Sequence, residues 1–111
     1  MPTHRDLAVL DAAEQVAAAV DRLADSKRRP LIHKTQLRES AQSVHANIGE
    51  AFGRGSKADR NRTLVIARGE AEETIRHLRA NLKAERIDEK MYWPLHNRLV
   101  TIVKMLNSLV A

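Results

Sequence analysis

The fold is decided by residues 56–84, which read SKADRNRTLVIARGEAEETIRHLRANLKA. Apolar side chains recur there at steps of three and four residues, which places them on one face of a helix. The members of this apolar stripe are Leu64, Ala67, Ala71, Ile75, Leu78 and Leu82. Ser56 precedes the stripe with Asp59 three residues later, the pattern of a capping box that opens a helix. We therefore predict a helix over residues 57–84.

Three other stretches show the same apolar period, and we predict helices over about residues 4–28, 33–53 and 88–110. Thr3 and Asp6 form a capping-box pattern before the first of them. Gly53 is a natural stop for the second, because glycine tolerates the left-handed backbone that ends many helices. Short connections between long helices place neighbours antiparallel. The sequence therefore predicts an all-α, antiparallel up-and-down four-helix bundle in a single domain over residues 1–111.

The composition excludes several classes of protein. Hydrophobic residues make up 43% of the chain, yet only three side chains are aromatic, a balance that suits close-packed helices better than a β sandwich or barrel. The absence of cysteine excludes disulfide frameworks and thiolate zinc sites. No apolar run approaches the roughly 18 residues that a membrane span needs, and no secretory leader is visible at the start. We expect a cytoplasmic protein with no membrane association.

Catalytic and metal chemistry find no support in the residue pattern. Ferritin-like bundles bind two metal ions through Glu-x-x-His pairs, and none of the five histidines has a Glu three residues before it. Glu73 and His77 are one turn apart, which is more typical of a solvated helix pair. The run from Gly53 to Lys57 lacks the spacing and the preceding strand of a phosphate-binding loop. We expect no enzyme activity, no catalytic residue, no metal and no cofactor.

Positive charge is concentrated around the third predicted helix. The chain carries 19 Lys and Arg against 14 Asp and Glu, a net charge of +5. Clustered cations attract phosphates by counterion release without reading base sequence. A solvated face laced with ion pairs one turn apart is the alternative interpretation. Three aromatic residues in the whole chain do not support a platform on which successive bases stack. The candidate nucleic-acid-binding residues are Arg54, Lys57, Arg60, Arg62, Arg76, Arg79 and Lys83.

Several apolar residues lie off the core stripes and suggest self-association. A large apolar side chain left in water forfeits the gain from its burial, although scattered surface apolar residues are also normal. The candidate oligomer-interface residues are Ile66, Tyr92, Trp93, Val100 and Val103.

Polar positions next to the core stripes suggest buried pairing. Arg68 lies at the flank of the third apolar stripe, where its guanidinium needs a partner if it leaves water. Asn47 and Glu50 on the second predicted helix are the candidate partners, and an arginine that reaches outward to solvent is the alternative. Gly49 and Gly69 lie inside helices at a cost of about 1 kcal/mol each relative to alanine, which suggests close backbone approach between helices or subunits.

Three runs together resemble a known family. They are QLR at 36–38, SVHANIGEAFGR at 43–54 and IARGEA at 66–71. The chain resembles the 23S ribosomal RNA intervening-sequence proteins, a family that also includes the accessory variability determinants of diversity-generating retroelements. The family pattern is S-I-P-x-N-I-A-E-G-x-G-R followed by I-A-R-G-S. This chain departs from it at His45, which replaces proline, at Gly49 and Ala51, which are exchanged, and at Glu70, which replaces serine.

The resemblance implies a four-helix bundle that assembles as a ring-like homopentamer with a basic surface suited to nucleic acid. For retroelement members it also implies association with a reverse transcriptase. Asn47, Glu50, Arg54 and Arg68 match the polar positions of the motif, the first two as structural residues. The sequence therefore favours a non-enzymatic, oligomeric accessory protein that binds RNA or DNA. The alternative is a protein-interaction scaffold, for example a partner of a reverse transcriptase, without nucleic-acid binding of its own.

Overall fold

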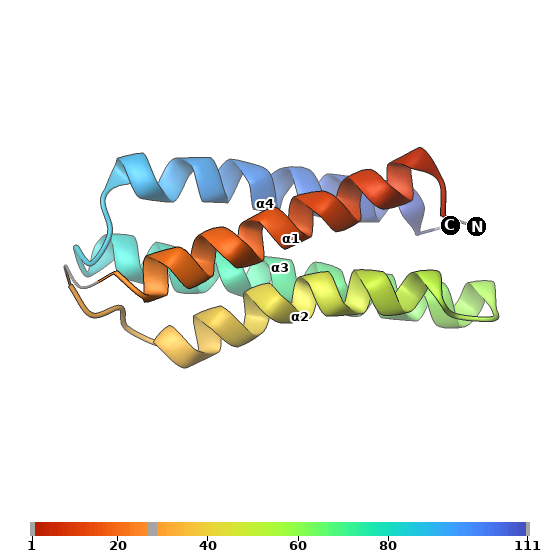
Figure 1. Cartoon of the computed structure of the whole chain (residues 1–111), viewed down its shortest axis with the longest axis horizontal. Coiled ribbons are helices and arrows are strands. Elements are labelled where there is room, and N and C mark those ends of the chain that lie inside the picture. The colour runs from red at the N-terminus through yellow and green to blue at the C-terminus, as the bar shows by residue number, and fades with distance from the viewer. Residues whose placement is uncertain (1, 27–28, 111) are drawn as a thin grey trace.

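Four helices packed in sequence order form the molecule in a computed structural model, which describes residues 2–26 and 29–110. The helices are α1 (His4–Ala24), α2 (Lys34–Phe52), α3 (Lys57–Lys83) and α4 (Glu89–Leu109). Each helix packs on the next along the chain, and α1 closes the bundle against α4. The chain runs up and down, so that both termini lie at one end of a bundle measuring 44 × 21 × 18 Å (Figure 1).

This architecture confirms the predicted all-α four-helix fold. The observed bounds of α2, α3 and α4 differ from the predicted ones by at most one residue at each end. The first helix was expected to reach residue 28 but ends at Ala24. The last two residues of that expected helix, 27 and 28, lie outside the described part of the chain. No helix among the described residues is long and apolar enough to cross a membrane.

The core is built from the predicted apolar stripes and is narrow. Six alanines are buried in it, which lets the helix backbones approach closely because alanine adds little side-chain volume. Gly49 and Gly69 are not needed for this approach: a Cβ at Gly49 would make only ordinary contact with Leu10 at 3.8 Å, and one at Gly69 would meet nothing within 4 Å. The largest fully buried apolar side chains are Leu37, Ile48, Leu64, Leu78, Leu99, Ile102 and Leu106.

The helix ends follow the predicted caps with one exception. Thr3 and Asp6 exchange the two hydrogen bonds of a capping box, and the Ser56 hydroxyl accepts from the Asp59 N–H at 3.2 Å. The prediction of a left-handed Gly53 is wrong, because its φ is −94° and its N–H instead donates to the Glu50 carbonyl in a tightened last turn. Left-handed backbone occurs at His33 (φ 52°) and Glu85 (φ 58°).

Asn81 on α3 fastens both connections at the end of the bundle away from the termini. Its side chain is fully buried, its Oδ1 accepts from the Ile32 N–H at 2.8 Å, and its Nδ2 donates to the Ile32 carbonyl at 3.0 Å. Its own main-chain carbonyl accepts from the Arg86 N–H at 2.9 Å, which closes the end of α3 around the left-handed Glu85. One residue therefore holds the α1–α2 connection and the α3–α4 connection in place.

Replacing Asn81 tests the part of this role that belongs to its side chain, the two hydrogen bonds to the α1–α2 connection. Asn81→Ala would leave the N–H and C=O of Ile32 without their partner, and each unsatisfied buried polar group costs about 1–3 kcal/mol. We expect the free energy of unfolding in urea to fall by about 2–4 kcal/mol. The matched control is Asn97→Ala, an exposed asparagine on α4, which should change stability by less than about 0.5 kcal/mol. Equal effects of the two variants would contradict the role of Asn81.

Candidate nucleic-acid interface

The structure divides the seven predicted phosphate-binding residues into two groups. Three of them already face carboxylates of the same chain. Arg54 pairs with Glu50 one turn earlier, and Arg62 lies 3.9 Å from Asp59. Exposed pairs of this kind contribute less than about 1 kcal/mol, so they leave Arg54 and Arg62 able to turn to another anion.

Arg60 is the most strongly engaged of the three. Its Nη2 lies 3.9 Å from Oδ1 of Asp6, whose side chain is only 8% exposed and belongs to the capping box of α1. Among the described residues, Asp6 Oδ1 and Arg60 Nε are buried without a hydrogen-bond partner. Moving Arg60 to a phosphate would leave the buried carboxylate without its counter-charge. Arg60 therefore links the starts of α1 and α3 and is the least available candidate.

The four remaining candidates form the basic face of α3. Lys57, Arg76, Arg79 and Lys83 are exposed, and none has an ion pair within residues 2–26 and 29–110. Arg76, Arg79 and Lys83 follow one another at steps of three and four residues, so they share one side of the helix. Arg68 lies two steps of four residues before Arg76, so it is at the other end of the same stripe.

Arg68 shows which neighbour this side of α3 borders. Its Nη1 donates to Oδ1 of Asn107 on α4 at 2.7 Å. The prediction that Asn47 or Glu50 partners Arg68 is wrong, because α2 packs on the opposite flank of α3, where Thr74 reaches Ser40 at 2.9 Å. Asn47 instead donates to Ser43 within α2, and Glu50 pairs with Arg54, so both serve local structure.

The α4 side of this seam carries Trp93. Because α3 and α4 are antiparallel and rise equally per residue, the Arg68–Asn107 bond places Arg79 level with His96, and Leu82 level with Trp93. Trp93 is 46% exposed, and its ring meets those of Tyr92 and His96 edge to face at 5.0 and 4.9 Å. Cations and one exposed indole therefore share the α3–α4 face.

The five predicted interface residues do not form one patch. Tyr92 was expected on an outer surface but is only 2% exposed, because its ring packs into the core of its own bundle. Val100 and Val103 are half-buried within the monomer. Ile66 is 43% exposed, and it lies on the other flank of α3, since two residues along a helix turn about 200° away from Arg68. Sequence analysis missed two further exposed apolar residues, Leu7 (52%) and Val65 (39%).

The flank of α3 that faces α2 has the opposite charge. Glu70 and Glu73 lie there, and His77 Nε2 is 3.4 Å from Glu73 Oε1. Burial raises the pKa of Glu70 above its ordinary value of 4.5, and the nearby charge of Glu73 raises it further. Glu70 and Glu73 therefore lie on the α2 side of α3, whereas Arg68, on its other flank, bonds to α4.

Glu70→Gln should stabilise the bundle at neutral pH. The raised pKa means that the folded chain favours the neutral carboxyl, so the ionised form opposes folding at pH values above the folded pKa. The gain from glutamine should shrink as the pH falls through that pKa and vanish near 4.5. Urea unfolding at several pH values measures this. Glu72→Gln, on the exposed side of the same helix, is the control, and a pH-independent gain would contradict the assignment.

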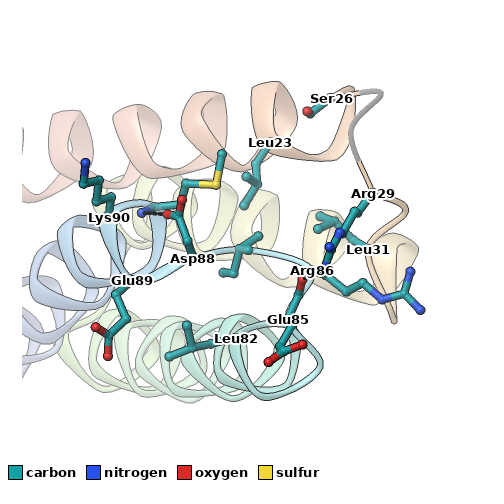
Figure 2. A pocket seen from close by; sticks show the side chains of 12 residues that line it. Leu23, Ser26, Arg29, Leu31, Leu82, Glu85, Arg86, Asp88, Glu89 and Lys90 are labelled. Carbon is teal, nitrogen blue, oxygen red and sulfur yellow. Dashed lines mark hydrogen bonds between the residues drawn. The ribbon is translucent and has the colours of Figure 1, made fainter.

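An open hollow of about 920 Å³ lies at the far end of the bundle, between the two connections (Figure 2). Its apolar floor includes Leu23 and Leu82, and its rim carries both positive and negative side chains. Arg29 and Arg86 already donate to main-chain carbonyls across the gap, at 2.7 and 3.3 Å. Because the rim carries both signs of charge, it does not favour a ligand of one particular charge. In the part of the chain that the structure describes, no three His, Asp or Glu side chains gather to hold a metal ion.

Comparison with known proteins adds to this geometry. The family model described as 23S rRNA-intervening sequence protein matches residues 5–108. The chain belongs to this family. A crystal structure of a protein of unknown function from the S23 ribosomal protein family of Bacteroides thetaiotaomicron is similar in fold, with a TM-score of 0.90. The two share 29% sequence identity over 96% of this chain and 97% of that one. The comparison with curated proteins found no match.

The family match confirms the resemblance drawn from residues 36–38, 43–54 and 66–71. In this intervening-sequence-family chain the motif residues build α2, the α2–α3 turn and the middle of α3. His45 replaces the motif proline inside α2, which runs uninterrupted from Lys34 to Phe52. A proline there would lack the N–H that donates to the carbonyl four residues earlier in the helix.

Proposed function

We propose that this intervening-sequence-family protein is a non-enzymatic accessory protein that binds nucleic acid through its phosphates. The observation that carries the proposal is the set of exposed cations on α3 that have no ion pair with any described residue: Lys57, Arg76, Arg79 and Lys83. Cations without an internal partner need not break an ion pair in order to bind a phosphate. On binding they displace the counterions condensed on the polyanion.

The spacing of these cations suits a nucleic-acid strand. Arg76 and Lys83 are seven residues apart, or about 10 Å along the helix axis. Phosphates of one strand follow at about 3.4 Å along a duplex axis, so this stretch can meet about three of them. Such contacts position the protein on the strand and carry no base sequence information.

Self-association is part of the proposal, in the ring-like pentamer that the family resemblance implies. Ile66 and Val65 offer exposed apolar area on the outer side of α3, next to Gly69, where open space would let a neighbouring backbone approach. Assembly would bring several copies of the basic face onto one particle, which raises affinity for a long polyanion through effective concentration.

Neutralising the basic face should weaken RNA binding. The variant Arg76→Gln/Arg79→Gln/Lys83→Gln loses three phosphate contacts, so the slope of log K against log salt should become shallower by about 2 for a single strand. Fluorescence anisotropy with a labelled RNA over about 50–200 mM salt measures this. The matched control removes the same charge from other exposed cations, Arg22→Gln/Lys34→Gln/Arg98→Gln.

Two outcomes would contradict the phosphate mechanism. One is an equal loss in the control, which would mean that net charge alone attracts the RNA. The other is an affinity that does not change with salt. A chain that binds no RNA but retains a reverse transcriptase after nuclease treatment would instead favour the scaffold function.

Light scattering tests self-association. The wild-type mass should be a multiple of the 12.5 kDa chain, about fivefold for the pentamer, and Ile66→Asp should lower it because a charge would be forced into the interface. Ala18→Asp, which adds the same charge at an exposed position on α1, should leave the mass unchanged. A wild-type monomer at micromolar concentration would contradict this part of the proposal.

A further inference from the structure

Trp93 is a large aromatic side chain that remains partly exposed to water. It is the only tryptophan in the chain and is 46% exposed on the α3–α4 face. Val100 and Val103 lie about two and three turns further along α4 and are half-buried within the monomer, so they do not form an apolar patch around it.

The indole is held in place before any ligand arrives. Tyr92 is buried beside it, and the Tyr92 hydroxyl lies 2.9 Å from His96 Nδ1, which fixes the imidazole one turn further along α4. Trp93 contacts both rings edge to face, with interplanar angles of 82° and 66°. A ring fixed by two neighbours loses little conformational freedom on binding.

Cations border the indole on both helices. The α3–α4 register places Trp93 level with Leu82, and Arg79 and Lys83 flank that position on α3. Lys90 lies one turn before Trp93 on α4 and is exposed. Glu72 and Glu89 are the nearby carboxylates in sequence, one at the middle of the α3 stripe and one in the first turn of α4.

We propose that Trp93 stacks on an unpaired base while Arg79 and Lys83 hold the adjoining phosphates. The α3–α4 face then prefers single-stranded RNA or DNA to a duplex, whose bases are stacked on one another and present no free ring face. This inference rests on the proposed function and names the form of nucleic acid that it takes. Every base has a π-face, so one stacking ring adds affinity without sequence preference.

Intrinsic fluorescence of the only tryptophan reports stacking directly. The full chain at low salt is titrated with an oligouridylate of about ten nucleotides, with an abasic strand of equal length and with an RNA duplex. We expect quenching by the oligouridylate and none by the abasic strand or the duplex, although all three bind through phosphates. The oligouridylate should also bind about tenfold more tightly than the abasic strand.

Trp93→Leu separates stacking from charge. With labelled strands, this variant should bind oligouridylate about tenfold more weakly and the abasic strand as before. Leu7→Ala removes a similarly exposed apolar side chain from α1 and should change neither.

Three results would overturn the inference. Equal binding of oligouridylate and abasic strands without quenching would remove the stacking role and leave phosphate binding intact. No binding of any strand at low salt would reject the proposed function as well. A lower mass of Trp93→Leu in light scattering would show that a second copy covers the indole in place of a base.

Discussion

A single buried amide, the side chain of Asn81, sets the geometry on which the rest of the bundle depends. Its two hydrogen bonds to Ile32 fix where the chain enters α2, and its main-chain carbonyl fixes how α3 turns towards α4. The buried side chain has three of its four hydrogen-bonding positions filled, counting the bond to the His77 carbonyl. An apolar residue of the same size would fill the space but would leave the N–H and C=O of Ile32 without these hydrogen bonds.

The positions of α2 and α4 around α3 decide which charged side chains border each neighbouring helix. With α2 on one flank of α3 and α4 on the other, Glu70 and Glu73 lie on the α2 side, while Arg68 bonds to α4 at one end of the exposed basic stripe. The net charge of the chain hides this separation, because it sums the charges on both flanks of α3. A ligand contacts one flank at a time. A modest surplus of positive charge thus becomes a local field on one face.

Helical periodicity was enough to predict the four helices, the bounds of three of them to within one residue and most of the core, since each stripe follows directly from 3.6 residues per turn. It could not identify the partner of Arg68 or the burial of Tyr92. A helical wheel gives the angle between side chains on one helix but does not say which neighbouring helix lies on which side. Four sequential helices can be arranged around the bundle axis clockwise or anticlockwise. The polar Asn81 within an apolar stripe was the one signal in the sequence of a buried tether.

The order of packing also bears on how the chain folds. Three of the four helix seams join elements that follow one another along the chain, and these can form as soon as each hairpin exists. The α1–α4 seam alone joins the first helix to the last, with Arg5 and Ser108 hydrogen-bonded near its open end. Closing that seam costs the most loop-closure entropy, because the longest stretch of chain lies between its two helices. The seam should therefore form late in folding and open before the others in native-state fluctuations.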